Sequence, residues 1–134
     1  MQEPKSARVV RPPKPFREFA RMHPAVAGAY ERLGEAVRAA GPLSAREVAL
    51  VKLSISIGAR MEGATHAHAR KALAQGIEAA ALEHLAILSC PTIGFPAMMM
   101  ALGYVRDVTG APGGRAHKSA TPRRRARGRG PART

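Results

Sequence analysis

The sequence predicts an all-α protein, a bundle of about five to six helices between a basic N-terminal arm and a basic C-terminal tail. Apolar residues make up 46% of the 134 residues, but aromatic residues only 4%. Alanine has the best helix propensity, whereas strands favour β-branched and aromatic side chains, so this composition suits closely packed helices. The distribution of charge also separates the helical middle of the chain from its C-terminal tail. Residues 24–109 hold eight Lys or Arg against seven acids, whereas residues 110–134 hold eight Lys or Arg and no acid.

The two ends of the chain are unsuited to a folded core. Residues 1–15 contain four prolines, which helix interiors exclude, and we expect a flexible Pro-rich arm there. Residues 110–134 combine glycine, proline and like charges, which indicates a disordered Arg/Gly/Pro-rich tail. Arginines of such a tail bind phosphates, so nucleic acid is a candidate partner, although the tail lacks aromatics that stack on bases. The alternative is a solvated extension.

The single cysteine gives an indication of the cellular compartment of the protein. Cys90 has no partner for an intramolecular disulfide, which is typical of proteins from a reducing cytoplasm. The N-terminus has no apolar run typical of a secretory signal, and no apolar segment approaches the roughly 20 residues that span a bilayer. We therefore expect a cytoplasmic protein that does not enter a membrane.

The first two helical segments are expected before residue 42. Residues 15–24 predict a short turn or helix that ends at Pro24. A longer helix follows, because Pro24 suits a first turn and Gly41 suits the position after a last turn. The apolar residues that recur at helical spacing in it are Val26, Tyr30, Leu33 and Val37.

The next segment, residues 44–60 (SAREVALVKLSISIGAR), carries two conflicting patterns. Ile55 and Ile57 alternate with serines, which is typical of a strand. Ser44 and Glu47, by contrast, predict a capping box, in which a hydroxyl and a carboxylate three positions later satisfy the start of a helix. We predict a helix. Because this helix would be apolar on most sides, we expect it to be fully buried.

Glycine and proline delimit the last three predicted helices. One covers residues 63–76 and ends at a glycine, and one covers residues 77–89 and is closed by Pro91. The last covers residues 96–108 and begins at Pro96. The short connections favour a bundle of antiparallel neighbours.

One junction between helices carries a family resemblance. Residues 58–76, GARMEGATHAHARKALAQG, resemble the carboxymuconolactone decarboxylase family, and its AhpD-like alkylhydroperoxidase branch in particular. That branch typically shows IGAR, then Cys-Glu-Gly-Cys, and a histidine after three more residues. Residues 57–60 read IGAR, and His68 stands at the position of the family histidine. Ala72, Leu73 and Gly76 stand at the expected offsets after it.

A second motif belongs to the same resemblance. Residues 94–97, GFPA, resemble the Gly-x-Pro-Ala segment that begins the last helix of the family. The resemblance covers residues 42–108 and implies an AhpD-like helical domain, which we place at residues 16–109.

The chain departs from the family pattern where the chemistry lies. Met61 and Ala64 stand at the positions of the two cysteines, and Ala49 stands where many members have a glutamate. In the alkylhydroperoxidase branch the resemblance implies that one thiolate attacks the peroxide and the other resolves it. Methionine and alanine cannot form a thiolate, so the two-cysteine cycle cannot run at this site. Glu62 and His68 remain in place.

The resemblance therefore implies two activities. One is a peroxidase activity of the peroxiredoxin type, impaired or altered by the missing cysteines. The other is lactone decarboxylation, which needs no cysteine pair and uses acid/base groups. In this chain His68 would be the acid/base, and Glu62 and His66 would assist it. The alternatives are a helix histidine at a buried interface and a non-catalytic oligomeric scaffold or small-ligand binder.

We expect no cofactor and no metal. His66 points about 200° away from His68 on a helix, so the two cannot easily hold one ion. Glu62 and His66 alone are too few ligands for zinc, and His66 is expected to pair with Glu62 or to lie near Arg70. Cys90 is expected to be buried and inert, and the alternative is a peroxidase thiol moved to that position.

The resemblance also implies a homo-oligomer, a trimer or hexamer with sites near subunit contacts. A small domain rich in Ala and Met gains from such burial. The run Met98–Met100 is accordingly expected in the core or at a subunit interface.

Overall fold

The computed structural model describes residues 10–115, and every regular element within that range is a helix. The helices are α1 (Lys14–Met22), α2 (Pro24–Ala39), α3 (Ala45–Gly58), α4 (Glu62–Ala74), α5 (Ala79–Leu88), α6 (Cys90–Ile93) and α7 (Phe95–Thr109). Six of them have nine or more residues, and α6 is a single turn of four. The predicted all-α class is confirmed.

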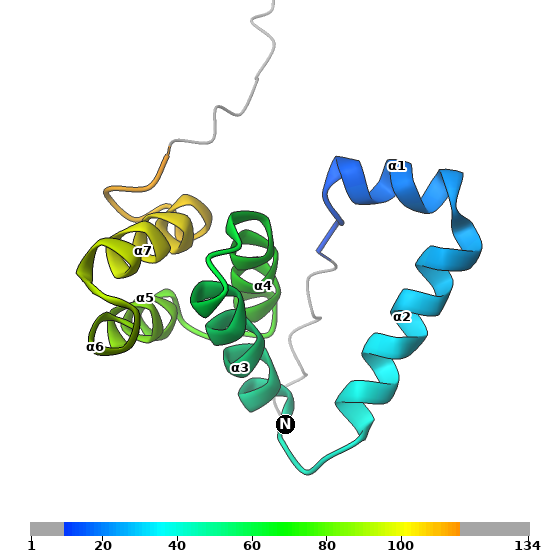
Figure 1. Ribbon diagram of the computed structural model, residues 1–134, viewed down its shortest axis with the longest axis horizontal. Coiled ribbons are helices and arrows are strands. Elements are labelled where there is room, and N and C mark those ends of the chain that lie inside the picture. The colour runs from blue at the N-terminus through cyan, green and yellow to red at the C-terminus, as the bar shows by residue number, and fades with distance from the viewer. Residues whose placement is uncertain (1–9, 116–134) are drawn as a thin grey trace, which may run out of the picture.

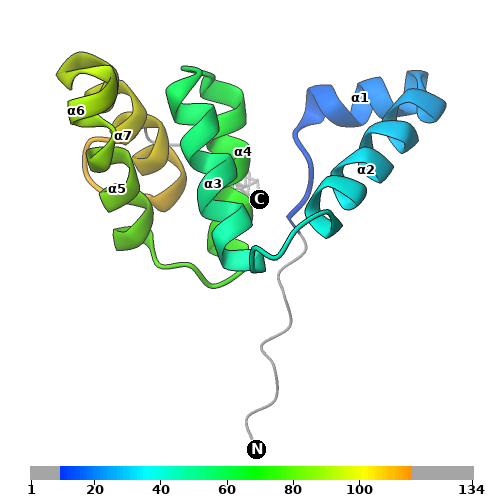
Figure 2. The same ribbon diagram turned by 60° about the horizontal axis from the view of Figure 1, so that its bottom comes forward.

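The helices form two unequal parts. Figures 1 and 2 show α3 and α4 side by side between α5–α7 on one side and a hairpin of α1 and α2 on the other. The hydrophobic core lies wholly in the larger part. Its buried members are Ala49, Leu53, Ile57, Ala69, Ala72, Ile77, Leu82, Ala86, Met98, Ala101, Leu102 and Val105. Among the described residues of α1 and α2, only Ala27 is buried.

Helix α3 begins as the capping box predicts. The Glu47 backbone N–H donates to Ser44 Oγ at 3.2 Å, and the Ser44 N–H donates to Glu47 Oε2 at 2.7 Å. The serines that suggested a strand do not oppose the helix, because Ser54 Oγ donates to the Leu50 carbonyl at 2.8 Å. A serine on a helix can satisfy its hydroxyl on the preceding turn in this way.

The expected full burial of α3 is wrong. Val51 is 44% and Ile55 64% exposed, because these two side chains lie on the face opposite the core, which no other helix within residues 10–115 covers. The inner face is fixed more firmly, since Thr65 Oγ1 of α4 donates to Ser56 Oγ at 3.3 Å inside the core.

The glycines and prolines lie at the helix ends as predicted, except for Pro91. Gly76 takes φ = +84° after α4, and the next backbone N–H, of Ile77, donates to the Ala72 carbonyl at 3.1 Å. This left-handed residue is what glycine permits at low cost. Pro91 does not close α5, which ends at Leu88, but stands in the first turn of α6.

Helix α1 starts at Lys14, two residues before the helical domain was expected to begin. Pro13 caps it without a side-chain hydrogen bond, and Pro15 stands in its first turn, where a missing N–H costs nothing. Most of the predicted arm (residues 1–15) and tail (residues 110–134) lie outside the described residues.

Within residues 10–115, none of the helices is long and apolar enough to cross a membrane.

Candidate functional site

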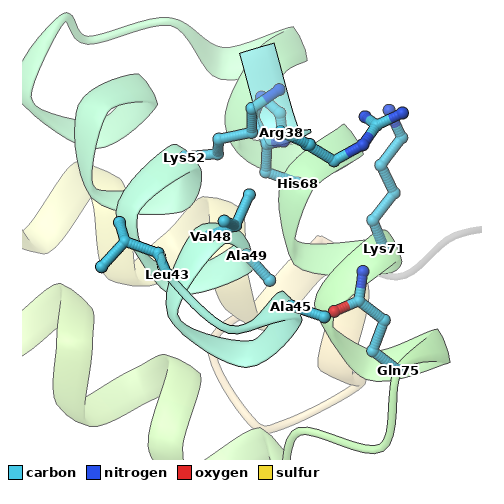
Figure 3. A pocket seen from close by; sticks show the side chains of 9 residues that line it. All are labelled: Arg38, Leu43, Ala45, Val48, Ala49, Lys52, His68, Lys71 and Gln75. Carbon is cyan, nitrogen blue, oxygen red and sulfur yellow. The ribbon is translucent and has the colours of Figure 1, made fainter. Parts of the chain in front are cut away.

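An open pocket of about 250 Å³ lies between α3, α4 and the C-terminal end of α2. Figure 3 shows the basic side chains gathered at one end of this pocket and the small apolar side chains at the other. Its lining residues are Arg38, Leu43, Ala45, Val48, Ala49, Lys52, His68, Lys71 and Gln75. We call it the His68 pocket.

Helical spacing explains why these residues meet. Side chains three, four and seven positions apart lie on one face of a helix. Helix α4 contributes His68, Lys71 and Gln75 at positions i, i+3 and i+7. Helix α3 contributes Ala45, Val48, Ala49 and Lys52 at i, i+3, i+4 and i+7. The two faces oppose each other because α3 and α4 pack side by side, and Arg38 reaches the pocket from α2.

The electrostatics of the pocket are dominated by positive charge. Partial burial lowers the pKa of His68, and the neighbouring charges of Lys71 and Lys52 lower it further. The imidazole is therefore neutral at neutral pH, with one nitrogen free to accept a proton. None of the described residues that line the pocket is acidic. An anion entering it meets cations and finds no carboxylate that repels it.

Ala49 lines the buried side of the pocket. Ala49 is 8% exposed and belongs both to the core and to the pocket lining. The resemblance places a glutamate of many family members here. A methyl group at this position leaves His68 without that carboxylate as a neighbour.

The other two predicted site residues lie elsewhere, so the structure does not bring the three together. His66 faces α7, where its Nε2 lies 3.0 Å from Asp107 Oδ2 and its ring makes an edge-on contact with Tyr104. Glu62 is at the start of α4, and its carboxylate lies 3.5 Å from the Arg115 guanidinium in an exposed pair. The expected pairing of His66 with Glu62 or Arg70 is therefore corrected to a pairing with Asp107.

The His66–Asp107 pair ties α4 to α7. Burial disfavours the charge on Asp107, but hydrogen bonds from the Arg115 backbone N–H and from His66, with the charges of both residues, hold the pKa of the carboxyl below its ordinary value. This pair joins two core helices and faces away from the His68 pocket, so we assign it a structural role.

The sulfur-bearing residues are also outside the His68 pocket. Met61 is 55% exposed at the N-cap of α4, and Cys90 is half-buried at the start of α6 against the core. Of the methionine run, Met98 is in the core, whereas Met99 and Met100 are close to half exposed. In the described part of the chain, no three His, Cys, Asp or Glu side chains are grouped so that they could hold a metal ion.

Sequence reasoning missed the cations of the pocket. Lys71 stands three positions after His68, a spacing that places both on one face of α4 and could have been noticed. Lys52 likewise stands three positions after Ala49, which places both on one face of α3. No spacing in the sequence indicates that Arg38 lines the pocket, because its position there depends on how the α1–α2 hairpin joins α3.

One of the three comparisons with known proteins found a match. Comparison with curated proteins and with solved structures gave no match. The family model for the carboxymuconolactone decarboxylase family matches residues 24–107, which include α2 to α6 and nearly all of α7. This is more than half of the chain, and the chain therefore belongs to the carboxymuconolactone decarboxylase family.

Proposed function

We propose that this protein binds a small carboxylated lactone in the His68 pocket and decarboxylates it by proton transfer at His68, without a cysteine pair. The observation that carries the proposal is the grouping of a neutral histidine with Lys52 and Lys71 in one pocket. Family membership narrows the substrate class, since the family takes its name from the decarboxylation of such a lactone.

Binding follows from the division of the pocket into two ends. Lys52, Lys71 and Arg38 offer charge-assisted hydrogen bonds to a carboxylate. Leu43 and Val48 give the carbon skeleton an apolar surface. The volume, about 250 Å³, suits a small substrate and is below the range of drug-sized ligand sites.

The chemistry needs a place for negative charge and a proton. When the bond to the carboxylate carbon breaks, CO₂ leaves and its bonding electron pair stays on the lactone as an enolate. The ammonium groups of Lys52 and Lys71 stabilise that charge. One proton must then reach the enolate carbon for each CO₂ released. His68 takes this proton from water and delivers it, because an imidazole can act as both a general base and a general acid.

A peroxidase has less support from the site. Met61 and Ala64, at the positions that the resemblance assigns to the cysteines, carry no thiol, and the thiol of Cys90 is outside the pocket. We expect no consumption of an organic hydroperoxide with a dithiol reductant above background. Consumption that is lost in Cys90→Ala would contradict this expectation and assign the activity to the remaining cysteine.

The second candidate function is a ligand binder without turnover, which the methyl group of Ala49 favours, because it leaves His68 without an acidic partner in the pocket. CO₂ release from carboxymuconolactone, together with calorimetric binding, separates the two functions. The matched control is His84→Gln, since His84 is an exposed histidine on α5 in a different groove.

We expect turnover in the unmodified chain, a loss of about 100-fold or more in His68→Gln, and no change in His84→Gln. Binding without turnover would establish the second candidate instead. Neither binding nor turnover would overturn both.

A further inference from the structure

The chain turns back on itself directly after α7. Gly110 takes φ = +75° and donates its N–H to the Arg106 carbonyl at 2.9 Å, which ends the helix. The Gly114 N–H then donates to the Ala111 carbonyl at 3.3 Å. Figure 1 shows this segment in orange, running back beside α7. We call residues 110–115 the C-terminal strap.

Gly114 lets the strap lie directly on α7. A Cβ at this position would overlap with the backbone of Arg106 and Asp107, so the strap and the last turns of the helix are in backbone contact. The φ of Gly114 is outside the left-handed region, so the close approach, and not the backbone conformation, requires glycine here. A residue with a side chain would move the strap off the helix.

Asp107 joins the strap to two helices at once. Its Oδ1 accepts a hydrogen bond from the Arg115 backbone N–H, and its Oδ2 lies 3.0 Å from His66 Nε2 of α4. A carboxylate has enough lone pairs for both contacts. The side chains of His66 and Asp107 are only 18% and 13% exposed, and a polar pair that is shielded from water interacts more strongly than an exposed one. The strap lies against this carboxylate and contributes to its shielding.

The side chain of Arg115 contributes less than its backbone. The guanidinium lies 3.5 Å from Glu62 Oε1 at the start of α4, but it is 81% exposed, and exposed ion pairs stabilise a fold little. The pair nevertheless shows where the strap ends, which is beside the first residue of α4 and not beyond the end of α7.

We propose that the C-terminal strap holds α4 on α7 through Asp107 and so fixes the beginning of the basic tail beside the start of α4. This goes beyond the proposed function and does not depend on it. The strap and the His66–Asp107 pair act as one unit, because the same carboxylate serves both. Lifting the strap therefore weakens the contact between α4 and α7 as well.

The alternative is a flexible linker that touches α7 without holding it. Residues 110–114 read GAPGG, and glycine-rich segments of this kind commonly behave as flexible chains. A strap with this composition cannot bury a core, so only the backbone contact at Gly114 and the hydrogen bond to Asp107 can hold it. Each of these two contacts can be removed by one substitution.

The first test is limited trypsin digestion of the full chain, because the strap contains a trypsin site. The bond after Arg115 is at the end of the strap, and the bond after Lys118, outside the described residues, is the internal reference. Mass spectrometry follows both cleavages, and each rate is divided by the rate at the same bond in a peptide of residues 110–122. We expect cleavage after Arg115 to be slower by about 10-fold or more, because the strap must open before the protease can act.

Two substitutions should remove this protection by different routes. Gly114→Ala adds the Cβ that overlaps with α7, and Asp107→Ala removes the acceptor of the Arg115 N–H. In both variants we expect the two normalised rates to become equal. The matched control is Gly103→Ala on α7, which should keep the protection, because a Cβ there lies in open space. Equal rates in the unmodified chain, or protection that survives Gly114→Ala, would overturn the proposal.

The second test asks whether the strap and the His66–Asp107 pair are one unit. Gly114→Ala, His66→Gln and the double variant are unfolded in urea, after circular dichroism has confirmed that each is folded. We expect the double variant to lose less stability than the two single losses added together, since either change alone already breaks the unit. Additive losses would contradict the proposal and would leave the strap as a linker that only touches α7.

Discussion

At the scale of single residues, the proposed function depends on the protonation of His68. Burial and the charges of Lys71 and Lys52 keep a proton off this ring in the folded chain, so its pKa there is below the value near 6.5 of the unfolded chain. Below that pH the unfolded chain binds the proton more readily than the folded chain does. The free energy of unfolding should therefore fall as the pH drops from 6.5 towards the folded pKa.

Replacing His68 should remove this contribution. In urea unfolding at pH 7 and pH 5, we expect His68→Gln to lose less stability on acidification than the unmodified chain, because glutamine has no proton to bind. The control is His84→Gln, which should keep the dependence that His68 causes, because His84 is on α5 and lies outside the His68 pocket. An unchanged dependence in His68→Gln would mean that the pocket does not hold its histidine neutral.

The candidate site was only partly predictable at this scale. His68 followed from its position in the family motif, but the motif placed Glu62 and His66 with it, and the structure does not. His66 turns to Asp107, which lies 41 residues further along the chain. No local spacing reveals such a partner, because the packing of α4 on α7 creates the contact.

At the scale of the elements, α3 carries half of the His68 pocket, and its capping box holds its start. Removing the Ser44 hydroxyl leaves the Glu47 backbone N–H without its acceptor. We expect Ser44→Ala to lower the free energy of unfolding by about 1 kcal/mol. The matched control is Ser54→Ala on the same helix, whose hydroxyl already bonds to the helix itself and whose loss should cost less than about 0.5 kcal/mol. The measurement is chemical denaturation. If Ser44→Ala and Ser54→Ala lower the free energy of unfolding equally, the capping box does not stabilise the helix.

The elements were largely predictable because their signals are local. The capping box, Gly76 and the prolines at the starts of α2 and α7 each act on neighbouring backbone groups, and helices lie where these signals predict them. The burial of α3 was not predictable, because it depends on which helices cover it. The apolar pattern of α3 is the same whether its outer face meets its own chain or a partner.

At the scale of the whole molecule, the charge of the tail predicts a salt-dependent association. Residues 116–134 lie outside the described residues and contain seven Lys or Arg and no acid. If the tail binds nucleic acid, its affinity for a random duplex DNA should fall by about 10³-fold or more between 50 and 200 mM salt, because each neutralised phosphate releases counterions. Fluorescence anisotropy with a chain ending at residue 115 is the control. Binding that survives this truncation, or that ignores salt, would reject the tail as the binding segment.

The central claim is that the His68 pocket receives a carboxylated lactone. The most direct measurement is the NMR titration of the His68 ring with pH, with and without a saturated γ-lactone carboxylate that cannot form the enolate. A bound carboxylate partly offsets the neighbouring lysines, so the pKa of His68 should rise when the ligand is present. The ring resonances of His84, which lies outside the His68 pocket, should not move when the ligand is added. A His68 pKa and resonance that do not change at millimolar ligand would contradict the account.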